Sequence, residues 1–328
     1  MRQATRWLMH FFLVAAVVTP MAASAQGQDF PNRPVRMVVG YAPGGAVDIM
    51  ARALAHQLSG IWKQPVVVDN RPGASEFIAA EHVAKAAPDG YTLFVATEIG
   101  LEVNPLLYSK MPYDPKKDFA PVSRVLDGPM MFAVSPTLPV KNMKEFIDYA
   151  KANPGKVNYG SSGNGGQVHL AMAYLAKASG IELIHVPYKG SAPAVADMVA
   201  GIVNSTAAPL SLLGPFVQSD KIRAIGIAGD KRAKVLPNVL TLKEQGYANL
   251  DASWALAVVA PAATPLQLRS KIAADIRTVL SDSKFVEEQF DRFGYTPIGD
   301  TPEQFGQYLI TNASKQAARV QAANVKLD

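Results

Sequence analysis

Short apolar runs alternate with amphipathic segments along the first third of the chain. Residues of high strand propensity fill the runs at 36–40, 65–69 and 91–97, and each run predicts a strand. Apolar residues recur every three or four positions over 48–61 and 77–86, which predicts two helices. This alternation indicates an α/β fold with a mostly parallel sheet.

A second series of the same kind follows. Two strands are predicted first, at 122–126 and 130–134. The next predicted strands lie at 157–159, 182–186 and 222–228, with helices at 143–152, 167–179 and 192–200 and an apolar stretch at 203–213. The chain ends with a buried strand at 255–260 and amphipathic helices at 266–281, 284–293 and 302–323.

This order of elements inserts one lobe into another. We therefore expect a discontinuous first lobe of residues 26–127 and 254–328 and a second lobe of residues 128–253. Two crossings between lobes are typical of a hinged cleft. Because ligands of α/β sheets bind beyond the carboxyl ends of strands, we expect a site between the lobes.

Residues 1–25 have the pattern of a secretory signal peptide. Arg2 and Arg6 precede an apolar stretch, and Ala23-Ser24-Ala25 forms an A-x-A cleavage motif. The apolar stretch is shorter than the roughly 20 residues that cross a bilayer, and Pro20 interrupts it. We expect cleavage after Ala25 and export to the periplasm rather than membrane anchoring.

The net charge and the cysteine content of the chain argue against several classes of function. Loss of Arg2 and Arg6 lowers the net charge from +5 to +3, too mild to indicate nucleic-acid binding without a basic stripe. The chain has 0 cysteines, which excludes thiol catalysis, thiolate metal sites and a lipidated N-terminal cysteine. The histidines lack metal-ligand spacing, and neither a phosphate loop nor a dinucleotide motif is complete. We expect no metal and no other cofactor.

Three glycine-rich turns, at 41–48, 159–166 and 185–191, stand where a strand gives way to a helix. Free backbone N–H groups at a helix start, together with the helix dipole, favour anions. In the second turn, the hydroxyl groups of Ser161 and Ser162 add side-chain donors to the backbone ones. Two such turns facing each other would hold a carboxylate.

Other interpretations of these residues stay open. Tyr188 either walls the cleft or is an ordinary residue at a strand end. Ser161 or Ser162 could act as a nucleophile with His169, as in a serine hydrolase, although the turn does not fit G-x-S-x-G and a core or capping histidine is favoured. A purely structural protein is disfavoured, because nothing structural requires hydroxyl groups and glycines at both rims of a cleft.

Several separated blocks carry a family resemblance. They are APGGAVD at 42–48, NRPGA at 70–74, APDGYTL at 87–93, PYD at 112–114 with DFAP at 118–121, YGSSGNG at 159–165 and HVPYKG at 185–190. With these blocks in this order, the chain resembles the Bug-type, or TctC-type, solute-binding proteins associated with tripartite tricarboxylate transporters. The similarity covers essentially the whole chain after residue 25.

The resemblance implies a two-lobed, type II periplasmic-binding-protein fold, with a hinged cleft between two mixed or parallel sheets flanked by helices. Such a protein closes over a small organic acid, without a cofactor and without turnover. In this family a ligand carboxylate is held largely by backbone N–H groups and bridging water near a first loop, here Gly44 to Asp48, with Gly44, Gly45 and Ala46 as the expected donors and Asp48 ordering the loop. Ala42 and Pro43, which precede them, are further candidate site residues. A serine-glycine loop contacts the carboxylate from the other lobe, here Ser161, Ser162, Gly163 and Asn164.

Three departures from the family pattern concern the ligand. Ser75-Glu76-Phe77 stands where a second glycine pair is usual, so bulk there would alter the cleft edge or the local packing. Thr97-Glu98 replaces small residues, and Glu98 in the cleft would repel a dianion and favour an amino, ring-nitrogen or hydroxyl group on the ligand. Glu98 on the surface would have neither effect. Ala208 stands near the position of a frequent acidic residue.

The sequence therefore predicts a monomeric periplasmic protein that captures a small carboxylate by closing its cleft and that is not an enzyme. Its expected partners are the membrane subunits of a tripartite transporter. An orphan binding protein that signals to a membrane sensor kinase is the alternative, which differs in partner and not in binding chemistry.

Overall fold

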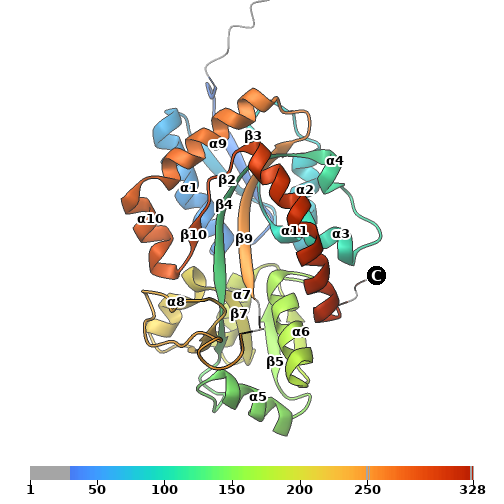
Figure 1. Cartoon of the computed structure of the whole chain (residues 1–328), viewed down its shortest axis with the longest axis vertical. Coiled ribbons are helices and arrows are strands. Elements are labelled where there is room, and N and C mark those ends of the chain that lie inside the picture. Colours follow the sequence, from blue (N-terminus) through green and yellow to red (C-terminus); the bar gives the residue numbers. More distant parts are fainter. Residues whose placement is uncertain (1–29, 249, 251, 326, 328) are drawn as a thin grey trace, which may run out of the picture.

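The computed structural model describes residues 30–248, 250, 252–325 and 327. The signal peptide expected at 1–25 lies outside these residues. The described chain forms two α/β lobes, one above the other along the long axis of the molecule, with strands inside and helices outside (Figure 1).

The sheet of the first lobe has the strand order β2-β1-β3-β9-β4. Strands β1 (Val35–Val39), β2 (Val66–Asn70) and β3 (Thr92–Thr97) are parallel, and β9 (Ser253–Pro261) is antiparallel to β3. Parallel strands need helical crossovers. The helices of this lobe are α1 (Ala46–Trp62), α2 (Phe77–Ala84), α9 (Leu266–Leu280), α10 (Ser283–Gln289) and α11 (Pro302–Ala323).

The second lobe repeats this arrangement on a smaller scale. Strands β5 (Asn158–Ser161), β6 (Ile184–Pro187) and β7 (Ser205–Pro209) pair in parallel, and β8 (Arg223–Ile227) is antiparallel to β4. Its helices are α5 (Met143–Ala152), α6 (Gln167–Ser179), α7 (Ser191–Val199) and α8 (Leu210–Gln218). The predicted apolar stretch 203–213 thus divides at Pro209 into a strand and a helix.

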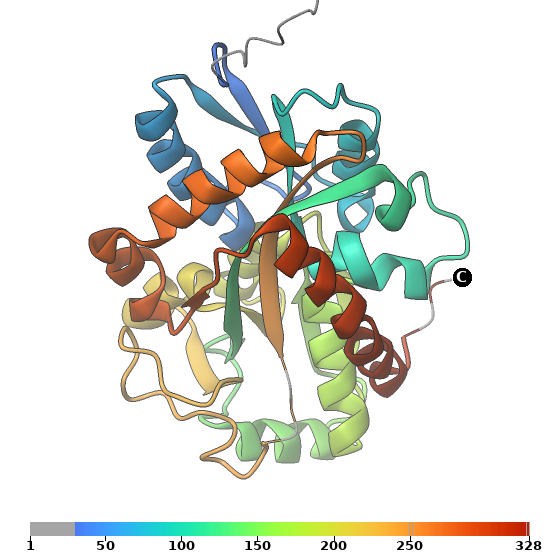
Figure 2. The same ribbon diagram turned by 45° about the horizontal axis from the view of Figure 1, so that its top comes forward.

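One long strand joins the two sheets. β4 (Phe119–Val134) pairs with β9 as far as Pro129 and with β7 and β8 from Met130 onward. β4 and β9 therefore run side by side from one lobe into the other (Figure 2). The prediction of two separate strands was wrong, because Gly128-Pro129 does not interrupt β4. Two irregularities in its register with β9 accommodate the bending of the strand.

Several short elements were not predicted. They are η1 (Ala74–Glu76), η2 (Ile99–Val103), α3 (Asn104–Leu107), α4 (Pro115–Asp118), η3 (Asp291–Phe293) and β10 (Thr296–Pro297). Three of the predicted helices, α5, α6 and α11, begin and end at the expected residues. Within the described residues, no helix combines the length and the apolar character that crossing a membrane requires.

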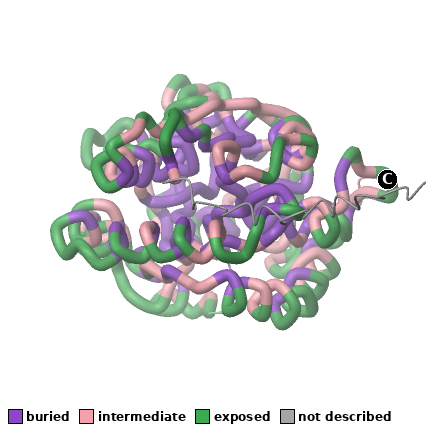
Figure 3. The backbone as a smooth tube through the Cα atoms, turned by 90° about the horizontal axis from the view of Figure 1, so that it is seen from above, coloured by how far each residue is buried: buried purple, intermediate pink, exposed green. Residues whose placement is uncertain are grey.

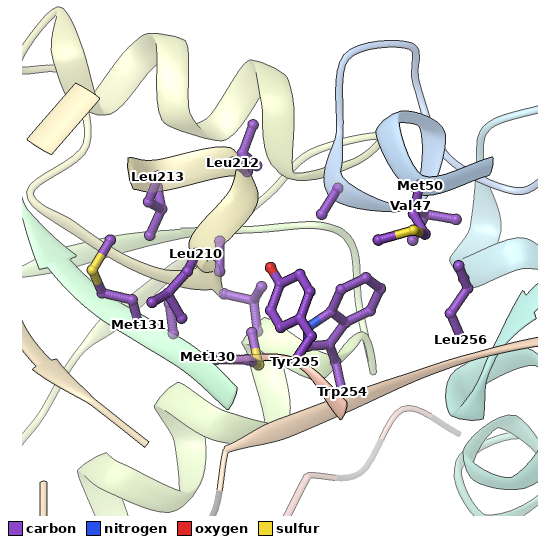
Figure 4. Packing of buried hydrophobic residues seen from close by; sticks show 14 of the residues in the cluster. Val47, Met50, Met130, Met131, Leu210, Leu212, Leu213, Trp254, Leu256 and Tyr295 are labelled. Carbon is purple, nitrogen blue, oxygen red and sulfur yellow. The ribbon is translucent and has the colours of Figure 1, made fainter. Parts of the chain in front are cut away.

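Buried residues follow the central strands, and exposed residues lie on the outer helices and loops (Figure 3). One apolar cluster continues across the junction of the lobes. At its centre Trp254 of β9 packs edge-on against Tyr295, with ring centroids 5.5 Å apart and planes at 81°. Val47 of α1 lies to one side of this pair and Leu210 of α8 to the other (Figure 4). The junction is thus a packed part of the core.

Candidate ligand-binding site

Four helices begin around one small cavity between the lobes. Gly45 precedes α1, Gln167 opens α6, Ser191 opens α7 and Pro209 precedes α8. The cavity, called the inner cavity below, has a volume of about 20 Å³ and is lined by Tyr41, Gly45, Ala46, Val47, Met130, Ser162, Gln167, Val168, Ser191, Pro209 and Trp254. Because helix N-termini carry partial positive charge, their convergence creates an anion-binding environment without a basic side chain.

The N-termini of these four helices lack side-chain caps. No N-cap side chain accepts a hydrogen bond from the first turn of α1, α6, α7 or α8. By contrast, Asn142 caps α5, Asp282 caps α10 and Thr301 caps α11, each with a side-chain oxygen. In α8 the first-turn N–H of Ser211 donates instead to the hydroxyl group of Tyr295 at 2.9 Å. The first turns of α1, α6 and α7 therefore keep N–H groups that no N-cap side chain engages and that can serve a ligand.

Ser162 adds a free hydroxyl group to this cavity. The residue is 6% exposed, and its Oγ has no hydrogen-bond partner in the structure. Buried polar groups are normally paired, because leaving one unpaired costs about 1–3 kcal/mol. An unpaired hydroxyl at the meeting point of four helix starts indicates a place for a ligand atom.

The hydroxyl group of Ser161, the neighbouring residue, already has hydrogen-bond partners within the protein. Its Oγ lies 2.6 Å from Nε2 of His185 and accepts a hydrogen bond of 3.1 Å from the backbone N–H of Gly163. It is 0% exposed and lines neither cavity described here. Ser161 therefore orders the serine-glycine loop, and Ser162 is the hydroxyl that the loop presents.

Asp48 holds the first loop in place. Its carboxylate accepts hydrogen bonds from the backbone N–H of Gly44 at 2.9 Å, from Arg52 at 3.0 Å and from Asn70 at 2.9 Å. Burial opposes ionisation of Asp48, but these hydrogen bonds and the charge of Arg52 outweigh it and hold its pKa below the usual value. The Gly44 N–H, one of the predicted ligand donors, is thus directed at Asp48 instead.

A larger, open cavity of about 760 Å³ adjoins the inner one. It is called the outer cavity below and is lined by Gly40, Tyr41, Gly73, Ser75, Tyr108, Ser162, Gly163, Asn164, Pro187, Tyr188, Lys189 and Pro193. Tyr41 and Ser162 line both cavities. Tyr188 walls this space, while its hydroxyl donates a 2.6 Å hydrogen bond to Asp197. Burial and Asp197 together raise the pKa of Tyr188 to about 12.

Contacts between the lobes close the cleft around these cavities. The Ala42 N–H donates to the Lys189 carbonyl at 3.3 Å. The Ser75 hydroxyl donates to the Asn164 carbonyl, which also accepts a hydrogen bond of 3.4 Å from Tyr108. The closed inner cavity holds little more than one water molecule. A carboxylate group needs more room than this, so it fits only if the walls of the inner cavity move apart.

The loop that carries Ser75 has an unusual backbone. Ser75 has φ of 49° and Glu76 has φ of 74°, a left-handed conformation that favours glycine. Ser75 lines the outer cavity, and Glu76 is buried and accepts hydrogen bonds of 3.1 Å from the backbone and the hydroxyl of Thr97. Burial raises the pKa of Glu76 to about 8.

Thr97, Glu98 and Ala208 are all buried and line neither cavity. Thr97 contacts the site indirectly, through a 3.2 Å hydrogen bond with the hydroxyl group of Tyr41. Glu98 is 5% exposed and accepts hydrogen bonds from the Ala255 N–H at 2.9 Å and from Gln167 at 3.3 Å. The interpretation of Glu98 as a surface residue was therefore wrong.

The structure brings six of the predicted site residues to the cavities, namely Gly45, Ala46, Ser162, Gly163, Asn164 and Tyr188. Ala42, Pro43 and Gly44 lie in the first loop, Asp48 in the first turn of α1 and Ser161 at the end of β5, and these residues line neither cavity. Tyr41, Gln167 and Ser191 line the inner cavity and were not named as site residues from the sequence. Tyr41 and Ser191 lie inside glycine turns that had been identified and Gln167 directly follows one, and this position was the available signal.

The hydrolase alternative meets a Ser–His pair, but not the expected one. Ser161 pairs with His185, and His169 stacks on His185 with ring centroids 3.9 Å apart. Burial lowers the pKa of each histidine to about 4. Among the described residues, no carboxylate is hydrogen-bonded to either ring, and no three His, Cys, Asp or Glu side chains gather to hold a metal ion. The Ser161 hydroxyl is buried away from both cavities, so this pair lacks the access that a nucleophile needs.

Comparison with known proteins gives a consistent result. The family model described as the tripartite tricarboxylate transporter family receptor, TctC, matches residues 50–325. The protein BugT of Bordetella pertussis is 34% identical over 318 residues, which cover 97% of this chain and 96% of BugT.

Solved structures are similar over most of the chain. The periplasmic binding protein BugD has a TM-score of 0.85 at 31% identity, with 90% of this chain and 99% of BugD covered. Rpa4515 of R. palustris with adipate has a TM-score of 0.87 at 31% identity, with 90% and 99% covered. MatC of Rhodopseudomonas palustris with bound malate has a TM-score of 0.82 at 27% identity, with 89% and 100% covered.

Proposed function

The chain belongs to the TctC family of tripartite tricarboxylate transporter receptors and has the two-lobed fold of periplasmic binding proteins, and from this premise we propose that it captures a small carboxylate in the periplasm. The captured acid is delivered to the membrane subunits of a tripartite transporter, and no turnover takes place. The relatives with adipate and with malate support a carboxylate as the ligand class, and they leave the particular acid open.

One observation carries this proposal. The starts of α1, α6, α7 and α8 meet at the inner cavity without side-chain caps, and the unpaired Ser162 hydroxyl lies among them. Hydrogen bonds to a charged group are worth about 1.5–3 kcal/mol each. A few of them support binding at about micromolar concentration or tighter, after the cost of ordering the ligand.

Capture requires relative motion of the lobes. We propose lobes of residues 26–127 with 254–328 and of residues 128–253, joined where β4 changes partner from β9 to β7 and β8. Opening would break the contacts of Ala42 with Lys189 and of Ser75 with Asn164. Binding of the acid and re-formation of these contacts would then favour the closed form together.

Isothermal titration calorimetry of residues 26–328 tests the proposal. Mono-, di- and tricarboxylates are titrated beside uncharged sugars and amines of similar size. We expect saturable binding of at least one acid and of no sugar or amine. Binding of sugars or amines with no acid bound would contradict the proposal.

A further inference from the structure

Gln167 and Glu98 form a buried polar pair at the inner cavity. Gln167 opens α6, lines the cavity and is 7% exposed. Its Nε2 donates a hydrogen bond of 3.3 Å to Oε2 of Glu98. The same oxygen accepts a 2.9 Å hydrogen bond from the backbone N–H of Ala255 on β9. Glu98 is therefore held by a strand that joins the lobes, and it in turn holds the amide of Gln167.

This arrangement fixes which end of the amide is left for a ligand. Oε2 of Glu98 accepts hydrogen bonds both from the Ala255 N–H and from Nε2 of Gln167, so Glu98 engages the N–H₂ end of the Gln167 amide. The carbonyl oxygen is then the hydrogen-bonding end that stays unengaged. Gln167 is the only one of the side chains lining the inner cavity that carries a carbonyl group, whereas the Ser162 hydroxyl and the helix starts offer donors.

The inner cavity thus combines an anion-binding environment with one strong acceptor. Ser162, Gln167 and the helix starts line the same cavity of about 20 Å³, so a ligand that enters it meets these groups together. A plain carboxylate satisfies the donors but leaves the amide oxygen without a partner, which costs binding energy. A carboxylate with a hydroxyl or ammonium group on the adjacent carbon satisfies both.

We propose that Glu98 and Gln167 together make the site selective for 2-hydroxy or 2-amino carboxylates. Gln167 is the specificity-determining residue, and Glu98 is a positioning residue that acts through it. This inference rests on the proposed function of carboxylate capture. It replaces the direct contact between Glu98 and the ligand that the sequence raised, because Glu98 lines neither cavity.

Matched ligand series test the inference by calorimetry. Succinate, malate and aspartate differ only in carrying hydrogen, hydroxyl or ammonium at carbon 2. Propionate, lactate and alanine form a second series, and phenylacetate, mandelate and phenylglycine a third. Within a series that binds, we expect a 2-substituted acid to bind about tenfold more tightly than the unsubstituted acid. Equal affinities, or tighter binding of the unsubstituted acid, would overturn the inference and leave the proposed function intact.

Two variants assign the roles. Gln167→Met keeps the length of the side chain and removes the amide. The ratio of the affinity for a 2-substituted acid to the affinity for the matching unsubstituted acid should therefore fall to about one, while the unsubstituted acid still binds. Glu98→Gln keeps the shape but lets the Gln167 amide turn, so the ratio should also fall. Gln307→Met, an exposed change on α11, is the control and should keep the wild-type ratio.

The ratio of affinities within one variant separates a loss of selectivity from a general loss of binding. A ratio unchanged in Gln167→Met would overturn the role of Gln167. A ratio unchanged only in Glu98→Gln would overturn the positioning role of Glu98. Failure of the wild-type protein to bind any acid, in the three series and in the wider carboxylate panel alike, would contradict carboxylate capture itself.

Discussion

Ser161 and Ser162 are adjacent hydroxyl-bearing residues with opposite surroundings. Ser161 contacts His185 and Gly163, whereas Ser162 has no partner and lies against both cavities. Successive residues at the end of a strand point to opposite faces, so the loop can devote one serine to its own order and the other to a ligand. The contrast separates a structural role from a binding role.

Ser162→Ala should weaken binding of the acid at least about tenfold, because it removes one charge-assisted hydrogen bond. Its free energy of unfolding should not fall, since the hydroxyl makes no hydrogen bond in the protein. Ser161→Ala should instead lower that free energy by about 1 kcal/mol, through loss of its internal hydrogen bonds.

Calorimetry and urea denaturation of the two serine variants measure these effects. If Ser162→Ala binds the acid with wild-type affinity, the hydroxyl is not a ligand contact. If Ser162→Ala loses stability as Ser161→Ala does, the two serines do not have separate roles.

At the scale of elements, closure of the cleft depends on contact between the glycine-rich turns 41–48 and 185–191. Gly190, which precedes α7, has φ of 134°, and a Cβ there would lie 3.2 Å from the backbone N of Ala42. That N–H donates to the carbonyl of Lys189 in the closed cleft. The absence of a side chain at Gly190 lets the two loops touch.

Gly190→Ala should therefore weaken ligand binding by holding the two loops apart. Gly246→Ala is the matched control, because Gly246 also has positive φ, at 86°, but has open space where the Cβ would lie. Both changes carry backbone strain, and only Gly190→Ala obstructs closure. Equal affinity of the two variants, compared by calorimetry with a bound acid, would argue against this role for Gly190.

The sequence predicted these elements unevenly, for physical reasons. Helix α6 was predicted at the correct bounds, because its signals are local: glycines before it and an apolar period within it. Strand β4 was divided at Gly128-Pro129, because its continuity depends on pairing with the distant β9. The turns located the site, but which side chains face the other lobe depends on tertiary contacts. Glu98 is an example, since its partner Ala255 is 157 positions away in the chain.

At the scale of the whole molecule, buried titratable groups make stability depend on pH in two opposing ways. Burial lowers the pKa of His169 and His185 to about 4, from an ordinary value of 6.5. Between these values the unfolded chain binds more protons, so stability is lost as pH falls from 6.5 toward 4. Burial raises the pKa of Glu76 to about 8, so Glu76 contributes stability that is lost as pH rises from 4.5 toward 8.

Replacement of one histidine isolates its contribution. His185→Gln should lose less stability than the wild-type protein as pH falls from 6.5 to 4, measured by urea denaturation at each pH. His56→Gln, a change at an exposed histidine, is the control and should follow the wild-type curve. Parallel curves for His185→Gln and the wild-type protein would show that His185 is not kept neutral by the fold.

The central claim is that an anionic group is held where four uncapped helix starts converge between two lobes. The most direct test is a crystal structure of the protein with the tightest-binding acid from the calorimetric panel. We predict a carboxylate in the inner cavity, within hydrogen-bond distance of Ser162 Oγ and of backbone N–H groups at the starts of α1 and α6. An acid bound outside the inner cavity, with Ser162 still unpaired, would contradict the account.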